Sequence, residues 1–86
     1  MKMPQIRSYG ENTAQANCMY IDLGNLGLYF SYETVVAFEY NGQLTVHENN
    51  WGTTTGKHLN WINPNKSIRI SSGEFEQKLQ AILDTI

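Results

Sequence analysis

Residues 52–57 hold the residue types that bind phosphate groups in many proteins. They run glycine, three threonines, glycine and lysine, whereas the phosphate-binding loop of nucleoside triphosphatases reads G-x-x-x-x-G-K-[ST]. Here the glycines are one residue too close, and His58 stands where that loop has a magnesium-binding hydroxyl. We therefore expect no nucleotide hydrolysis. The threonines are expected to cap a helix and the glycines to serve the turn, with a weaker anion site as the alternative.

The two histidines and the single cysteine form no recognisable metal or catalytic motif. His47 and His58 lie on separate expected elements, without the close spacing of metal ligands. Nothing brings Cys18 to either histidine, and a hydrolase using His58 with Thr54 or Glu48 lacks triad spacing. We therefore expect no catalytic residue, no metal and no cofactor. His58 is expected to make a structural hydrogen bond, and Cys18 to be a small buried side chain.

Aromatic and basic residues make residues 51–58 the expected binding loop. An exposed tryptophan there would be an interface anchor, although tryptophans are more often core residues. Lys57 at a helix start opposes the helix dipole, so we expect it to contact either a partner or an internal carboxylate such as Glu48. The expected partner-binding residues are Trp51, Thr54, Lys57, His58 and Trp61.

Composition and charge narrow the classes of function. The 86 residues suit one domain, and a hydrophobic fraction of 41% argues against disorder. The net charge of −2 and the scattered basic residues argue against a nucleic-acid-binding module. That module remains the alternative, with exposed tyrosines for stacking. It would use Lys57, Lys66 and Arg69, together with Tyr29 or Tyr32.

The hydropathy of the sequence indicates whether the protein associates with a membrane. No segment approaches the roughly 20 apolar residues of a membrane span, and the N-terminus has no apolar signal segment. We therefore expect no membrane association and a cytoplasmic location.

Apolar alternation separated by turn residues predicts strands over residues 19–23, 26–32, 33–40, 43–48 and 67–70. The dipeptide Asn41-Gly42 favours a two-residue hairpin turn, because both positions of a type I′ turn need positive φ. With that register, Val35 and Ala37 share a face with Leu44 and Val46. Both faces of the third strand carry apolar residues, so we expect helices to cover both sides.

Two helices complete the expected fold. A short helix follows the fourth strand and ends before the Asn-Pro-Asn of residues 63–65. Ser71 and Glu74 form a capping box for the final helix. Its apolar positions are Phe75, Leu79, Ile82, Leu83 and Ile86. The expectation is an α+β fold: a small antiparallel sheet of four to five strands with a C-terminal helix packed on one face. Residues 1–17 are expected to be a flexible arm and 18–86 a single domain.

Several segments resemble a group of small bacteriophage proteins that have no established activity. They are residues 28–32, 34–38, 48–49, 51, 54–60 and 70–75, within a span of about residues 20–83, and their signature is the W-x-x-T-T-G-K-H-L-N pattern of residues 51–60. The resemblance implies a phage origin and the host cytoplasm. We therefore expect a non-enzymatic phage accessory protein that binds a host or phage macromolecule, foremost a protein, through residues 51–58. Self-association through a sheet edge or an aromatic strip is a further expectation.

Overall fold

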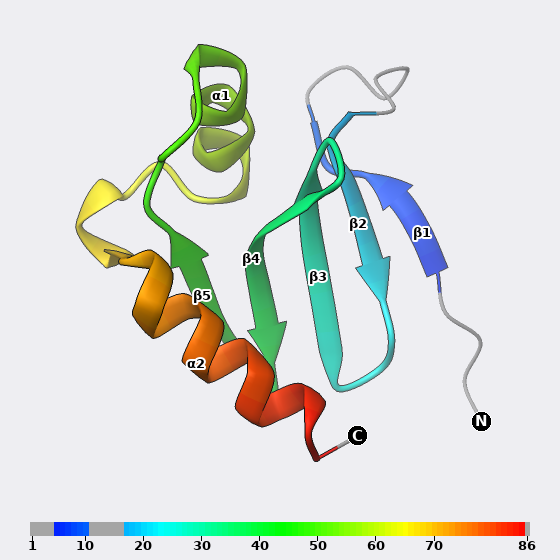
Figure 1. Cartoon of the computed structure of the whole chain (residues 1–86). Helices are drawn as coiled ribbons and strands as arrows, with labels where there is room; N and C mark the ends of the chain where they lie inside the picture. The colour runs from blue at the N-terminus through cyan, green and yellow to red at the C-terminus, as the bar shows by residue number, and fades with distance from the viewer. Residues whose placement is uncertain (1–4, 11–16, 86) are drawn as a thin grey trace.

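The computed structural model describes residues 5–10 and 17–85, which form one six-stranded sheet and two helices (Figure 1). The elements are β1 (Gln5–Ser8), β2 (Met19–Asp22), β3 (Leu26–Ser31), β4 (Thr34–Tyr40), β5 (Gln43–His47), α1 (Thr53–Ile62), the 3₁₀ turn η1 (Lys66–Ile68), β6 (Arg69–Ile70) and α2 (Ser72–Leu83). The strands lie in sequence order. All neighbours are antiparallel except β5 and β6, which are parallel. The α+β class is confirmed, with six strands rather than four to five.

The additional strand comes from the segment expected to be a flexible arm. Part of that arm, residues 1–4 and 11–16, lies outside the described residues. Gln5–Ser8 forms β1, an edge strand that pairs with β2. The Arg7 guanidinium lies 4.7 Å from the centre of the Tyr20 ring, a cation–π contact across the two strands. Four residues are too few to show a strand period, so only the pairing reveals this element.

The hairpin between β4 and β5 has the expected turn and register. Asn41 and Gly42 have φ values of 51° and 84°, as a type I′ turn requires. Tyr40 pairs with Gln43, and Ala37 pairs with Val46 three positions further from the turn on each strand. A two-residue turn fixes the register from local sequence alone.

A bulge in β4 moves Val35 and Val36 to the faces opposite those that regular alternation predicts. Tyr29 pairs with Ala37 and the next residue, Phe30, pairs with Val35, so Val36 is the extra residue. An extra residue reverses the alternation of side chains beyond it. Val35 therefore packs in the cluster of Phe38, not with Ala37 as the regular alternation predicted.

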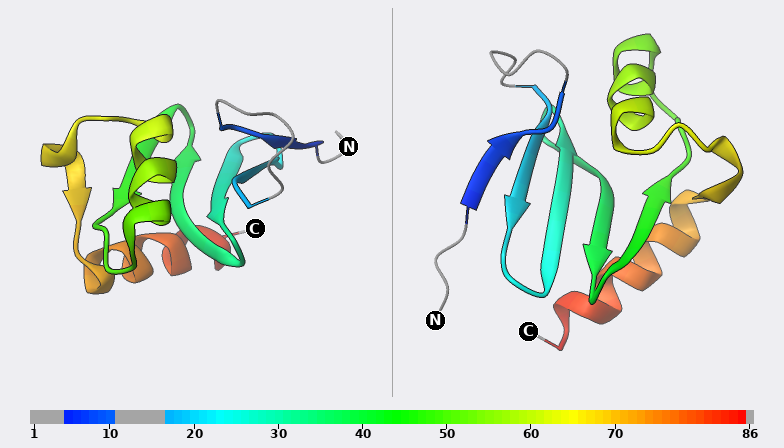
Figure 2. Two further views of the ribbon diagram at one scale, coloured as in Figure 1. Left: turned by 90° about the horizontal axis from the view of Figure 1, so that it is seen from above. Right: turned by 180° about the vertical axis from the view of Figure 1, so that it is seen from behind.

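Helices cover both sheet faces, as expected from the apolar residues on each side of β4. On one face α1 packs through Leu59 and Ile62; the sheet residues of this cluster are Val36, Ala37, Val46, Tyr29 and Leu44. On the other face α2 packs through Phe75, Leu79 and Ile82; the other members of this cluster are Leu26, Phe38, Leu28, Val35, Tyr40 and Ile70. Both helices lie on the β3–β6 side, away from β1 (Figure 2).

The final helix differs from expectation at Leu83 and agrees with it at the Ser71 cap. Leu83 is 43% exposed and lies outside the core, because α2 turns it away from the row formed by Phe75, Leu79 and Ile82. Ile86 lies outside the described residues. Ser71 is the N-cap, and its side chain accepts a hydrogen bond from the Glu74 backbone N–H at 3.4 Å, as the capping box predicts.

Candidate functional site

Both helices begin at the same end of the sheet. The parallel strands β5 and β6 are each followed by a helix, α1 after β5 and α2 after β6 (Figure 1). The carboxyl ends of parallel strands point in one direction, so the two strand-to-helix junctions are neighbours. Ligands of α/β sheets bind in the crevice beyond such ends. This end of the molecule carries residues 47–58 and 71–73.

An asparagine, rather than a threonine, organises the loop before α1. The Asn49 Oδ1 atom accepts a hydrogen bond from the Trp51 backbone N–H at 3.0 Å, and the Asn49 Nδ2 atom donates to the Gly52 carbonyl at 3.2 Å. Gly52 is the N-cap and supplies no side-chain cap. The expectation that a threonine caps α1 is therefore wrong: Thr53 is already the first helical residue.

The same helix start differs from a phosphate-binding loop, as the sequence spacing predicts. Residues 53–56 are helical, whereas a phosphate-binding loop surrounds its anion with the backbone N–H groups of a non-helical turn. Gly56 has a packing reason instead, since a Cβ atom there would lie 3.1 Å from Asn49 Nδ2. Among the described residues, no three His, Cys, Asp or Glu side chains are grouped so that they could hold a metal ion.

The five expected partner-binding residues divide into exposed and covered sets. Trp51 is 43% exposed, and Thr54 and Lys57 are exposed on α1. Trp61 is half-buried, and its ring centre lies 5.5 Å from that of His58. His58 is only 1% exposed, so the expectation that His58 contacts a partner directly is not supported by its position.

His58 belongs to a buried polar cluster that joins α1 to the end of β3. Its Nδ1 atom lies 2.7 Å from Ser31 Oγ, which lies 3.0 Å from Thr55 Oγ1. The rings of Tyr9 and Tyr32 are centred 6.2 and 5.9 Å from the imidazole. Burial lowers the pKa of His58, because the charged form would lose its hydration. The structural hydrogen bond expected for His58 is thus present.

Lys57 does not have the internal partner considered for it. Within the described part of the chain, no ion pair joins its ammonium group to a carboxylate, so Glu48 does not neutralise it. Lys57 is the fifth residue of α1 rather than part of its first turn. Since the dipole effect fades within the first turn, the electrostatic cost expected at this position is small. The charge is directed to solvent.

A histidine–serine pair at the junction was missed by the sequence reasoning. The His47 Nε2 atom lies 3.0 Å from Ser72 Oγ, and His47 Nδ1 lies 2.6 Å from the Glu48 carbonyl oxygen. Asn50 Nδ2 donates to Ser72 Oγ at 3.0 Å. His47 ends β5, one residue before the predicted strand end, and Ser72 begins α2 after the predicted Ser71 cap. The parallel pairing of β5 with β6, which brings the two residues together, does not follow from sequence.

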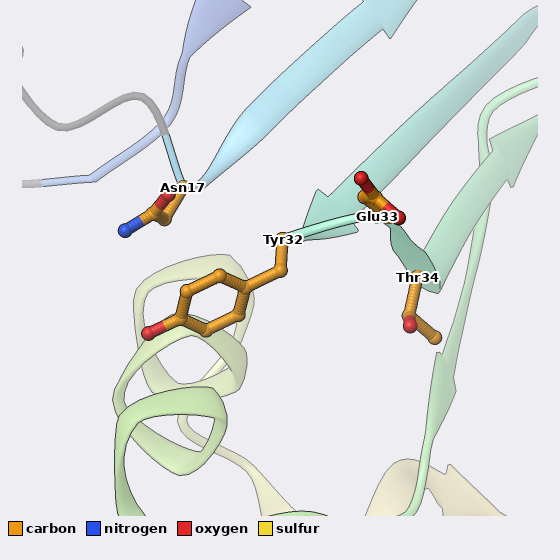
Figure 3. Close-up of a pocket in the computed structure, with 4 residues that line it drawn as sticks. All are labelled: Asn17, Tyr32, Glu33 and Thr34. Atoms are coloured by element: carbon orange, nitrogen blue, oxygen red, sulfur yellow. The ribbon is translucent and has the colours of Figure 1, made fainter.

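A separate open hollow of about 530 Å³ lies at the turn between β3 and β4. Its lining residues are Asn17, Tyr32, Glu33 and Thr34 (Figure 3). Tyr32 has a φ of 57°, an uncommon conformation for a bulky residue, and its N–H donates to the Asn17 carbonyl at 2.7 Å. The side chains of Glu33 and Thr34 turn away from the Tyr32 ring in the figure, so the groups do not converge and we assign no ligand to them.

Comparison with known proteins places the chain in a family. The model of a family of unknown function, DUF8033, matches residues 1–77. The chain belongs to this family. No curated protein and no solved structure matches it. The match to DUF8033 includes β1 and both strand-to-helix junctions, and it assigns no activity to them. In the described residues, no helix is long and apolar enough to cross a membrane.

Proposed function

We propose that this chain is a small phage accessory protein that binds a host or phage protein in the host cytoplasm. The contact surface is formed by Trp51, Thr54 and Lys57, which we term the Trp51 face. The observation that carries the proposal is the exposure of Trp51, a residue that is 43% accessible to solvent just before α1. Tryptophan and arginine contribute much of the binding free energy at protein interfaces. A solvent-exposed indole leaves apolar surface in contact with water, and covering that surface with a partner is favourable.

The exposed indole is held in place before any partner arrives. The Trp51 backbone is fixed by the side chain of Asn49, and its ring centre lies 4.7 Å from that of His47. A side chain that is already ordered loses little conformational entropy when it binds. Trp51 therefore has the properties of an interface anchor rather than those of a loosely attached surface residue.

Lys57 gives the Trp51 face its charge preference. Its ammonium group is exposed and forms no ion pair with the described residues, so a carboxylate of the partner would be its first charged contact. Charge complementarity of this kind raises association rates and selects partners more than it adds affinity. We propose a partner with an apolar pocket for Trp51 and an acidic group for Lys57.

A capture experiment with matched variants tests this surface. Tagged protein is incubated with lysate of phage-infected bacteria, and bound proteins are compared between Trp51→Ala and Leu83→Ala, since Leu83 has the same exposed fraction of 43% on α2. A hot-spot loss of about 2 kcal/mol lowers affinity roughly 30-fold, so Trp51→Ala should lose the partner and Leu83→Ala should keep it. Equal recovery by both variants would remove the Trp51 face from consideration.

The nucleic-acid alternative retains only part of its expected surface. Tyr29 is half-buried, with ring centres of Tyr9 at 5.3 Å and Tyr20 at 4.6 Å, and Arg69 is half-buried and donates to Asn60. Lys57, Lys66 and Tyr32 remain exposed. Tight, salt-dependent binding of a single-stranded oligonucleotide that is lost in Tyr32→Ala would favour this alternative.

Self-association through the sheet edge is a second proposal with its own observation. β1 pairs only with β2 among the described strands, and Ile6 on it is 65% exposed. An open edge with an apolar side chain is a template for strand pairing. If two copies pair there, sedimentation should show a dimer for the wild type and a monomer for Ile6→Lys. A wild type that is monomeric at high concentration would exclude the edge.

A further inference from the structure

The pair formed by His47 and Ser72 has the hydrogen-bond order of a nucleophile with its general base. A carbonyl oxygen can only accept, so His47 Nδ1 carries the proton that points at the Glu48 carbonyl, 2.6 Å away. In the neutral ring, His47 Nε2 is then an acceptor. The Ser72 hydroxyl, 3.0 Å from it, donates its proton to that nitrogen. A histidine can activate a serine as a nucleophile only if the hydroxyl donates its proton to the imidazole, as it does here.

The surroundings fix His47 in this orientation. The imidazole is 5% exposed and lies between two aromatic rings, with centres at 4.7 Å for Trp51 and 4.8 Å for Phe75. The Glu48 carbonyl takes the orienting role that a carboxylate has in a serine–histidine–aspartate triad. Asn50, which donates to Ser72 Oγ, positions the hydroxyl and stabilises negative charge that develops on its oxygen.

Ser72 remains accessible and lies beside donors for a developing oxyanion. It is half-buried, and the next residue, Gly73, is exposed with no atom within 4 Å of the position that a Cβ would take. Ser71 satisfies two N–H groups of the first turn of α2, those of Glu74 and Phe75. The N–H groups of Ser72 and Gly73 have no partner inside the helix, and backbone N–H groups at this position stabilise tetrahedral oxyanions.

We propose that Ser72 is a nucleophile activated by His47, and that it accepts acyl groups from small, solvent-accessible esters. Ser72 Oγ attacks the ester carbonyl carbon while its proton moves to His47 Nε2. The alcohol leaves with that proton as the carbon–oxygen bond of the ester breaks, which yields acyl-Ser72. A water molecule, deprotonated by His47, attacks the acyl carbon and releases the acid together with Ser72 in its original state. Water is the one co-reactant, and no electrons are exchanged with an oxidant or reductant.

This activity is independent of the Trp51 face as a binding surface, although Trp51 forms one wall beside His47. The Trp51 face requires only exposure and charge, whereas the acyl-transfer site requires the hydrogen-bonded order from Glu48 through His47 to Ser72. The two proposals therefore fail in different experiments: loss of partner capture does not bear on the reactivity of Ser72.

A fluorophosphonate probe tests the proposal directly, because it phosphonylates activated serines and leaves ordinary ones unmodified. The probe is added to folded wild type, and the labelled residue is located by peptide mass spectrometry. Removing a general base lowers such rates roughly 10²–10⁴-fold, so His47→Gln should lose most of the labelling and Ser72→Ala all of it. The matched control is Ser67→Ala, which removes an exposed hydroxyl that bonds to Asn65 and should keep the label.

Two outcomes overturn the proposal. One is folded wild type that is labelled no faster than the same protein unfolded in urea, since an unfolded chain has no paired His47. The other is labelling that persists in Ser72→Ala. The urea comparison uses wild type alone, so the test stands even if His47→Gln fails to fold. Release of more than one equivalent of p-nitrophenol from p-nitrophenyl acetate per wild-type protein, and none by Ser72→Ala, shows full turnover, whereas a reactive serine that stops at the acylated state releases a single equivalent.

Discussion

His58 lies in a buried site where a charged imidazole would lose its hydration. It is 1% exposed and bonded through Nδ1 to Ser31, and burial lowers its pKa. The sequence indicated the structural role but not the partners, because Ser31 and Thr55 lie on different elements. The same limit hid Ser72 from His47, which is 25 positions away in the chain. Short-range patterns identify residue types, whereas tertiary pairing decides which residues meet.

Acid should destabilise the fold through His58. The pKa of His58 is 6.5 in an unfolded chain and lower in the fold, so the unfolded chain binds a proton that the folded chain does not as the pH falls below 6.5. The free energy of unfolding therefore decreases as the pH falls below the unfolded pKa. Above that pKa, the contribution of His58 to the free energy of unfolding does not change with pH.

Thermal melts at about pH 7.5 and about pH 5 measure this effect. The melting temperature of wild type should drop more between the two values than that of His58→Gln, because other titrating groups are shared by both proteins. An equal drop in the two proteins would show that His58 does not titrate differently in the fold.

At the scale of helices and strands, the features that could be predicted from sequence are those determined by residues adjacent in the chain. The type I′ turn, the Ser71 cap and the stop after α1 all follow from a few adjacent side chains. The bulge at Val36, the edge strand β1 and the parallel β6 depend on distant segments. A two-residue strand such as β6 has too few positions for an apolar period, so its place in the sheet could not be read from its own sequence.

The hairpin turn should be sensitive to a β-branched residue at Gly42. Its φ of 84° lies in the left-handed region, where a side chain costs roughly 1–2 kcal/mol, and a β-branched one more. Gly42→Val should therefore lower the free energy of unfolding measured in urea by at least that amount. Gly52→Ala is the control, since Gly52 has a φ of −130° and open space around it; it should change stability by less than about 0.5 kcal/mol. A larger loss from the control than from Gly42→Val would refute the turn assignment.

The amphipathic face of α2 gives a second test at this scale. Phe75 is 3% exposed and its ring centre lies 5.1 Å from that of Phe38, so Phe75→Ala should cost about 3–5 kcal/mol. Gln77 is exposed on the same helix, and Gln77→Ala should be nearly neutral in the same denaturation experiment. Similar losses from both substitutions would mean that α2 does not pack on the sheet through Phe75.

At the scale of the molecule, an antiparallel meander is joined to a short parallel unit. The unit runs β5, α1, β6 and α2, with the helices on opposite faces. This arrangement gathers the helix starts, the exposed Trp51 and the His47–Ser72 pair at one end of the sheet. The strand β1 forms the edge of the sheet opposite β6, and both helices pack over the β3–β6 part of the sheet (Figures 1 and 2). The proposed partner binding and the proposed strand-edge pairing therefore involve separate surfaces.

The central claim is that a protein partner covers the Trp51 face, and site-specific photo-crosslinking tests it most directly. A benzophenone amino acid replaces Thr54 in one protein and Leu83 in another, two exposed positions that leave Trp51 in place, and both proteins are irradiated in lysate of phage-infected bacteria. A discrete crosslinked species from position 54, absent from position 83 and reduced when Lys57→Ala is added, is the predicted result. Crosslinking of the same protein from both positions, or from position 83 alone, would contradict the claim.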